Sequence, residues 1–200
     1  MIGKFDGFHR GHRKLMEKAL EDRREGEQIV LFTFSRPPRS VMTGRMDTGI
    51  STREERRRLV EAAGADVLLE FPFTPEVVRT TARQFLSEIL LGRLHMREIV
   101  AGPDCAFGYR RAGNISFLQE NQEAGGYRLQ VVPKEMYRGG EISSNRIRSC
   151  LEAGQVEDAE ADLNRITHKF VIEEMETRLR AHAMNGGTLV TTFSICRSTL

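Results

Sequence analysis

Several residue types and patterns are scarce in this chain, and each absence excludes a class of protein. There is no tryptophan, and the three cysteines (Cys105, Cys150 and Cys196) form neither a CxxC pair nor an even-numbered framework. This usage is typical of a reducing cytosol and not of a disulfide scaffold. No apolar run is long enough to span a membrane, and the N-terminus lacks the apolar core of a secretory signal. We therefore expect a cytoplasmic location.

A strong charge of one sign is also missing. The chain has 30 Lys and Arg against 28 Asp and Glu, a net charge of +2, so no general basic surface marks a nucleic-acid or membrane partner. Charged residues at 29% and hydrophobic residues at 40% are ordinary globular values and disfavour disorder. The length of 200 residues fits one large domain, or one domain with an appendage.

Helices and strands are predicted to alternate along the chain. The segment 11–24 carries apolar residues at helical spacing, whereas 28–34 is a continuous apolar run typical of a buried strand. Strands separated by helices form βαβ units, so we expect an α/β fold with a mainly parallel sheet and helices on both faces. Further helices are predicted over 51–63, 81–91, 115–124 and 144–153, and further strands over 65–70, 98–101 and 127–132.

The helix predicted over 51–63 carries its own boundary signals. Ser51 and Glu54 fit a capping box at its start, and Gly64 is placed to end it in the left-handed conformation. The mixed charges of residues 53–58 are interpreted as a solvated helix face.

Residues suited to binding a phosphate gather just before the first predicted helix. His9 and His12 are three residues apart at a helix start and project to one side, and Gly11 lets a ligand approach the backbone. A helix N-terminus adds unsatisfied amides and a partial positive charge, so this set suits a phosphate whose charge grows in a transition state. The pair could instead bind a metal with Asp6 or His95, but no ligand-spaced set recurs and we expect no metal site.

A second candidate phosphate site opens the helix predicted over 144–153. Ser143 and Ser144 can supply hydroxyl groups at its N-terminus, and Arg148 lies four residues beyond Ser144 on the same face. A guanidinium group suits bidentate binding of phosphate oxygens. Ligands of open parallel sheets bind beyond the carboxyl ends of the strands, so we expect these residues to meet there.

Four segments in a fixed order carry a resemblance to a known family. They are GKFDGFHRGH at 3–12, TFSRPP at 33–38, GPDCAFGYRRAG at 102–113 and ISSNRIR at 142–148. The first contains the HxGH arrangement of adenylyl- and cytidylyltransferases. From Gly3 to Arg165 the chain resembles the adenylyltransferase module of bacterial FAD synthetase, the bifunctional riboflavin kinase/FMN adenylyltransferase.

The resemblance implies a Rossmann-like nucleotidyltransferase fold that transfers AMP from ATP to FMN, giving FAD and pyrophosphate with Mg²⁺ present. It implies catalytic roles for His9, His12 and Arg148, and flavin binding by Asp104 and Phe107. The positions that match the ATP-binding segments of the family are Gly3, Lys4, Phe5, Asp6, Gly11, Ser143, Ser144 and Asn145.

Some of these residues also fit simpler roles. Asp6 suits a turn or a cap as well as a ligand contact. The aromatic residues Phe5, Phe8 and Phe107 are expected to pack in the core more than to stack on a ligand.

The chain departs from the family pattern at several positions. Lys4 replaces an Asn and adds a cation near the phosphates, and Pro37 replaces a His, which removes a donor near ATP. Cys105 replaces a Phe and reduces the aromatic area on the flavin side. Asn145 replaces a Thr, a mild change because both residues cap helices.

The two ends of the chain differ from the family in length and pattern. Only Met1 and Ile2 precede the motif that begins at Gly3, so we expect the chain to begin inside the first strand of the family. We predict a nucleotidyltransferase domain over 1–165 and a short extension over 166–200, too short for a riboflavin kinase barrel. Riboflavin kinase activity is therefore not expected.

Two other functions remain open on the sequence. The chain could transfer AMP to a different phosphate acceptor, such as nicotinamide mononucleotide, phosphopantetheine or a sugar phosphate, although the loop at 102–113 argues against this. It could also be a nucleotide- or flavin-binding protein without catalysis, an interpretation motivated by Pro37 and Cys105.

Overall fold

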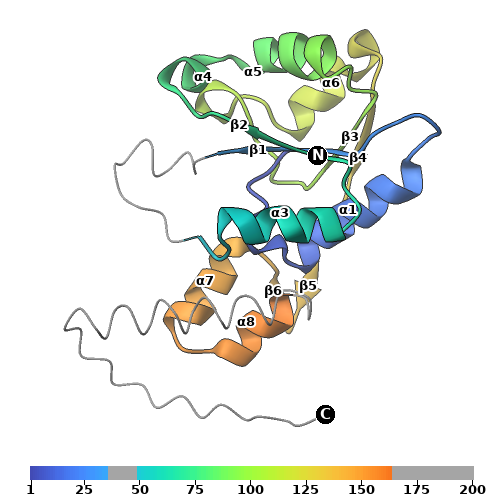
Figure 1. Ribbon diagram of the computed structural model, residues 1–200. Coiled ribbons are helices and arrows are strands. Elements are labelled where there is room, and N and C mark those ends of the chain that lie inside the picture. The colour runs from blue at the N-terminus through green and yellow to red at the C-terminus, as the bar shows by residue number, and fades with distance from the viewer. Residues whose placement is uncertain (36–48, 164–200) are drawn as a thin grey trace.

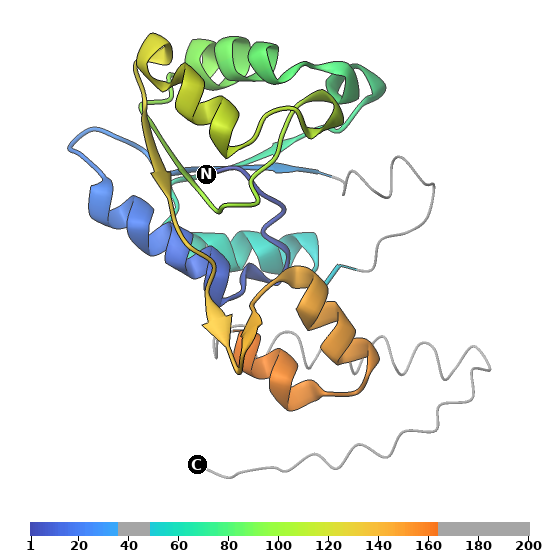
Figure 2. The same cartoon turned by 180° about the vertical axis from the view of Figure 1, so that it is seen from behind.

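The computed structural model describes residues 1–35 and 49–163. Within them, strands form a central layer and helices cover both of its faces (Figures 1 and 2). This arrangement confirms the α/β fold. Pro37, Cys196 and the predicted domain boundary at 165 with the extension beyond it lie outside the described residues.

The strands of the central layer pair in parallel, as predicted, but in the described residues as two separate two-stranded sheets and not as one continuous sheet. Strand β1 (Val30–Phe34) pairs with β2 (Val67–Phe71), and β3 (Glu98–Ala101) pairs with β4 (Arg128–Val131). The segment at Ile2 runs along β1, where the amide of Gly3 donates to the carbonyl of Phe32 over 3.1 Å. The first loop (residues 3–9) therefore leaves the sheet at its carboxyl edge.

Two clusters of buried side chains lie on opposite faces of this layer. Leu31 of β1 packs with Met16 of helix α1 (Arg10–Asp22) and Leu59 of helix α3 (Arg53–Ala62). Its neighbour Phe32 packs in the other cluster, with side chains of a π-helix (Phe85–Arg93), α6 (Ile115–Gly125) and β3. Successive strand residues point to opposite faces, so a strand buried on both sides is apolar throughout.

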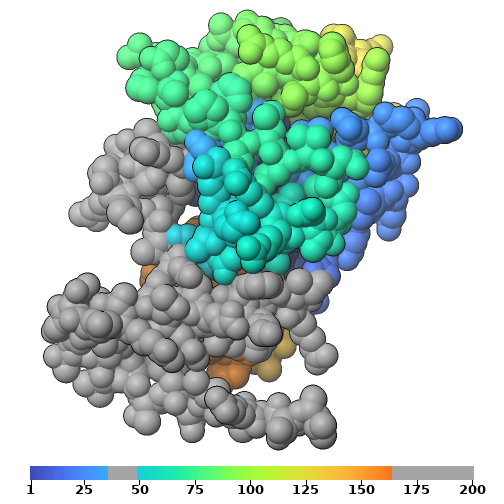
Figure 3. Space-filling view, viewed as in Figure 1, coloured from blue at the N-terminus to red at the C-terminus, as the bar shows by residue number. Residues whose placement is uncertain are grey.

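Short helices complete the layer that contains α6. Helix α4 (Pro75–Arg79) was not predicted, and α5 (Ala82–Gln84) runs directly into the π-helix over the segment predicted as one helix. In the space-filling view, α3 lies at the surface, on the other side of β1 and β2 from the layer formed by α4, α5 and α6 (Figures 1 and 3).

The segment after β4 contains two elements that the sequence patterns missed. A hairpin of β5 (Met136–Tyr137) and β6 (Gly140–Glu141) precedes α7 (Ser144–Glu152), and α8 (Val156–Asp162) follows it. The hairpin turn uses Arg138 and Gly139, with φ angles of 47° and 75°. A two-residue hairpin turn needs left-handed φ angles of this kind. The sequence did not indicate the turn, because arginine stands where asparagine, aspartate or glycine is typical.

The start of α3 shows that the predicted capping box was wrong by one residue. Thr52 is the N-cap: its side chain accepts from the amide of Glu55, and the Glu55 carboxylate accepts from the Thr52 amide. Ser51 instead contacts the first loop, where its hydroxyl oxygen accepts from the Gly7 amide over 3.0 Å. The predicted end of the helix is confirmed, because Gly64 has a φ of 93°.

The interpretation of residues 53–58 as a solvated face was only partly right. The carboxylate of Glu70 on β2 is only 6% exposed and forms ion pairs with Arg53, Arg56 and Arg57 at 2.8, 2.9 and 2.6 Å. Burial alone would raise the pKa of Glu70, but hydrogen bonds from the three guanidinium groups outweigh it and lower the pKa to about 2. These bonds fasten α3 to the edge of β2.

Replacing Glu70 by Gln should destabilise the fold at neutral pH by about 1–3 kcal/mol, because hydrogen bonds to a charged group are lost. A depressed carboxyl pKa stabilises the fold above the unfolded value of about 4.5, and this contribution disappears as the pH falls towards 2. Urea unfolding of wild type and E70Q at pH 7 and at pH 2–3 measures the difference. A gap that stays constant over this range would contradict the role given to the arginines.

Candidate functional site

The first loop has a strained backbone held in place by buried rings. Phe5, Gly7 and Phe8 have φ angles of 50°, 72° and 38°. Left-handed angles are unfavourable for phenylalanine, so the surroundings must stabilise them. The side chains of Phe5 and Phe8 are 1% and 2% exposed and pack against α1 and α3, which confirms the prediction that they belong to the core. Burial of these rings offsets the strain.

His9 and His12 stack on one another at the start of α1. Their ring centroids are 3.7 Å apart and the ring planes differ by 19°. His9 is the N-cap residue of α1 and is buried, and the Nδ1 atoms of both rings are buried without a hydrogen-bond partner. Gly11 packs closely against this stack: a Cβ atom there would lie 3.2 Å from the ring of His9, so the ring would have to shift slightly. The structure thus brings the two predicted histidines together.

Both imidazoles are uncharged at neutral pH. Burial lowers the pKa of His9 to about 4, although the charge of Asp104 acts in the opposite direction. Burial and the neighbouring His9 hold the pKa of His12 well below its usual value. Buried imidazoles with unpaired nitrogen atoms can bind an anion that supplies the missing hydrogen-bond acceptor or induces protonation.

The start of α7 lies against the first loop, as the sequence predicted. Ser143 caps α7 by accepting from the amide of Arg146, and the hydroxyl of Ser144 donates to the carbonyl of Asp6 over 3.2 Å. Arg148 donates to the Asp6 carboxylate over 2.8 Å and to the side-chain oxygen of Asn145 over 2.7 Å. The N-termini of α1 and α7 therefore meet at one point, with Asp6 between them.

Two of the predicted ATP-binding residues lie at the sheet side of this point. Lys4 is exposed, and no carboxylate of residues 1–35 or 49–163 lies within ion-pair distance of its ammonium group. Its carbonyl accepts from the hydroxyl of Thr33 over 3.3 Å. Gly3 packs closely on Phe5, because a Cβ atom there would lie 3.2 Å from the ring.

The loop after β3 holds the predicted flavin-binding residues in very different settings. The side chain of Asp104 is 72% exposed, 3.6 Å from the ammonium group of Lys134. Phe107 is only 7% exposed and packs between Phe85 and Phe117. The burial of Phe107 confirms its packing role.

Sequence reasoning missed the contribution of the segment just before α3. The amides of Ile50 and Ser51 donate to one Asp6 oxygen, Oδ1, over 2.9 and 3.1 Å. Serine at 51 and threonine at 52, followed by glutamate at 54 and 55, fit a capping box in two registers. With Thr52 as the N-cap residue, the side chain of Ser51 would have been available for a contact with another segment.

No metal cage accompanies these residues: in the described part of the chain, no group of three or more His, Cys, Asp or Glu side chains could hold a metal ion. The same part contains no helix that is long and apolar enough to cross a bilayer.

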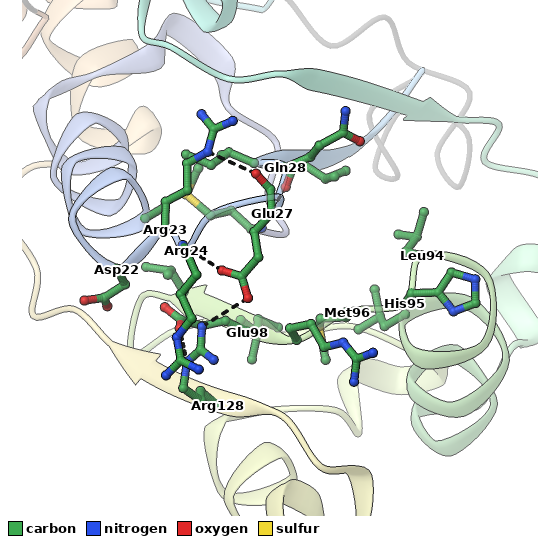
Figure 4. A pocket seen from close by; sticks show the side chains of 18 of the residues that line it. Asp22, Arg23, Arg24, Glu27, Gln28, Leu94, His95, Met96, Glu98 and Arg128 are labelled. Carbon is green, nitrogen blue, oxygen red and sulfur yellow. Dashed lines mark hydrogen bonds and ion pairs between the residues drawn. The ribbon is translucent and has the colours of Figure 1, made fainter.

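A cavity of about 870 Å³ lies away from the candidate site, at the opposite edge of the sheet. Residues at the starts of β1, β3 and β4 line it together with Met1. Figure 4 shows its charged rim, where Arg128 contacts Glu98 at 2.5 Å and Glu27 at 3.5 Å. Ligands of such sheets bind beyond the carboxyl ends of the strands, and no predicted site residue lines this cavity.

Replacing His9 by Gln should change how stability depends on pH. Histidines of the unfolded chain titrate near 6.5 whereas folded His9 titrates near 4, so the unfolded state binds more protons and stability falls below about pH 6.5. We expect the loss of unfolding free energy between pH 7 and pH 5 to be roughly 1–2 kcal/mol smaller in H9Q. Urea unfolding at both pH values measures this. Equal losses in wild type and variant would contradict a depressed pKa.

Comparisons with known proteins show which family this chain resembles. The family model for FAD synthetase matches residues 1–146. The chain is 28% identical over 167 residues to a bifunctional riboflavin kinase/FMN adenylyltransferase of Buchnera aphidicola, and 28% identical over 173 residues to that of Escherichia coli K12. These alignments cover 82% and 86% of this chain and 54% of each relative, so the chain spans about half the length of these relatives.

Two further proteins are similar to large parts of this chain. An FAD synthetase of Listeria monocytogenes is 29% identical over 169 residues, covering 80% of this chain and 65% of that protein. A crystal structure described as a macrolide-efflux protein from Streptococcus pneumoniae superposes with a TM-score of 0.72 at 27% identity, covering 81% of this chain and 53% of that one. Because the family model covers residues 1–146, well over half of the chain, this protein belongs to the FAD synthetase family.

Proposed function

We propose that this protein is an FMN adenylyltransferase, which transfers AMP from ATP to FMN and releases FAD and pyrophosphate. The observation that carries the proposal is the meeting of the α1 and α7 N-termini at Asp6, with the His9–His12 stack and Arg148 beside it. Two helix N-termini and a guanidinium group suit a polyphosphate. Membership of the FAD synthetase family supports the choice of FMN as acceptor.

The proposed reaction is a displacement at phosphorus. An oxygen of the FMN phosphate attacks the α-phosphorus of ATP, the bond from that phosphorus to the bridging oxygen of the β-phosphate breaks, and pyrophosphate leaves with the electron pair. Such transfers depend on positioning and on stabilising charge, and they need little covalent chemistry from the protein.

His9, His12 and Arg148 would be the catalytic residues. The two imidazoles are uncharged in the free protein, so each can donate one hydrogen bond through a protonated ring nitrogen. Charge that develops on the phosphate oxygens would raise the pKa of these rings and strengthen those bonds. Arg148 retains donors beyond those used by Asp6 and Asn145.

The remaining contacts to ATP would come from the two helix starts and the first loop. The α1 amides near Gly11 and the α7 amides that follow Ser143 would face the phosphates, and Lys4 would supply a cation that has no carboxylate partner among the described residues. Asp104 would lie on the flavin side. The other positions proposed to contact ATP are Gly3, Ser144, Asn145 and the backbone of Phe5, whose ring is buried in the core.

Mg²⁺ would enter as the complex with ATP. This cation prefers oxygen ligands and is commonly held by substrate phosphates with few protein groups. On the cysteine usage of the sequence we place the reaction in the cytoplasm, with ATP and FMN as the partners and without nucleic acid or membrane.

The purified protein should form FAD and pyrophosphate from FMN and ATP with Mg²⁺. His12→Ala and Arg148→Ala should each lower kcat/KM by about 10²–10³-fold, because each removes a group that stabilises transition-state charge. Chromatographic detection of FAD measures this, with Glu157→Gln on the exposed side of α8 as control. Undiminished activity in both alanine variants would contradict the assigned roles, and tight FMN or ATP binding without turnover would favour a non-catalytic binding protein.

The 200-residue polypeptide should not form FMN from riboflavin and ATP, since the sequence shows no riboflavin kinase signature within it. The measurement is the appearance of FMN under the conditions that give FAD from FMN. FMN formed by the purified polypeptide would refute this expectation.

A further inference from the structure

We propose that Asp6 is a positioning residue that orients Arg148 and fixes the first loop, and that it does not itself contact ATP. The inference rests on the proposed adenylyltransferase function. It departs from the resemblance, which places Asp6 among the ATP-binding positions.

The first support is that the carboxylate of Asp6 is already occupied. Its Oδ1 atom accepts from the Ile50 amide, the Ser51 amide and the Ser51 hydroxyl at 2.9, 3.1 and 3.4 Å. Its Oδ2 atom accepts from Arg148 over 2.8 Å, and the side chain is 13% exposed. A carboxylate with both oxygens engaged has little capacity left for a ligand.

The second support is electrostatic. An ionised carboxylate next to the phosphates of ATP would repel them, because like charges destabilise one another at short range. The ion pair with Arg148 compensates the charge of Asp6 within the protein. A group that repels the substrate unless it is paired is better suited to holding the arginine than to binding ATP.

The third support is the position of Asp6 in the backbone. It lies between Phe5 and Gly7, both with positive φ angles, and the strain must be balanced by contacts with other segments. Asp6 makes such contacts with Ile50, Ser51 and Arg148, which lie 44, 45 and 142 residues further along the chain. Its carbonyl also accepts from Ser144 at the start of α7. One residue thus joins the first loop, the start of α3 and the start of α7.

The consequence for Arg148 is a fixed orientation. Arginine has a long side chain with large rotamer freedom, which is lost when it binds a phosphate. Asp6 and Asn145 hold two of its terminal nitrogens at 2.8 and 2.7 Å, so this freedom is already restricted before ATP arrives.

The test is Asp6→Asn in a cycle with Arg148→Gln. The side-chain oxygen that remains in D6N can still accept from the Ile50 and Ser51 amides, whereas the NH₂ group that replaces Oδ2 cannot accept from Arg148. We expect D6N to lower kcat by about tenfold or more with KM for ATP unchanged or lower, since a negative charge is removed while orientation is lost. In the R148Q background, D6N should change kcat by less than about twofold.

A direct contact between Asp6 and ATP predicts the opposite pattern. A KM for ATP that rises in D6N, or an equal loss of kcat with and without Arg148, would overturn the proposal. Asp22→Asn is the matched control: it alters a Lys18–Asp22 pair of 2.8 Å at the far end of α1 and should leave kcat and KM unchanged.

A second measurement needs no activity and separates this inference from the proposed function. If Asp6 holds Arg148, the two substitutions should not be additive. The drop in urea midpoint of the double variant should be smaller than the sum of the drops in D6N and R148Q. Additive losses would overturn the positioning role even if FAD is formed. Absence of FAD formation by the wild type would overturn the proposed function, while non-additive midpoints would still support the contact.

Discussion

The carboxylate of Asp6, in the first loop, accepts hydrogen bonds from two other parts of the chain. One is the backbone just before α3, and the other is the side chain of Arg148 on α7. Around it, Phe5, Gly7 and Phe8 adopt left-handed backbone angles that only a well-packed environment sustains. The loop turns sharply after the sheet and delivers His9 to the start of α1. Without this turn, the two helix N-termini would not meet.

The chain has a net charge of only +2, and the structure shows how the cations near the site are used. Many cations near the site are already paired: Arg10 and Lys14 bind Glu135, and Arg146 binds the buried Asp162. Three more arginines converge on Glu70 of β2. We therefore propose that attraction for phosphate comes from a few aimed groups, which are the helix amides, the histidine pair and Arg148, and not from a broad basic surface.

Periodic segments of the sequence predicted much of the fold. The strand over 98–101 and the helix over 115–124 agree with the structure to within a residue, because continuous apolar runs and helical spacing report burial directly. The hairpin at Arg138–Gly139 and helix α8 were missed, since they are short and their stability comes from tertiary contacts such as Arg146–Asp162. Local patterns carry little information about such contacts.

The candidate site was predictable in its residue types but not in its internal contacts. The spacing of His9 and His12 indicated a common direction, and the structure shows the rings stacked. The links from Asp6 to Ser51 and Arg148 span 45 and 142 residues, and no local spacing encodes them. The burial that keeps both imidazoles uncharged is likewise a property of the packed fold.

The most direct test of this account is to map where ATP binds by nuclear magnetic resonance of the isotope-labelled protein with Mg²⁺. We expect the backbone amides at the starts of α1 and α7, near Gly11 and Ser144, to shift on titration with ATP. Shifts concentrated instead around Glu98 and Arg128, at the cavity on the opposite edge of the sheet, would contradict it.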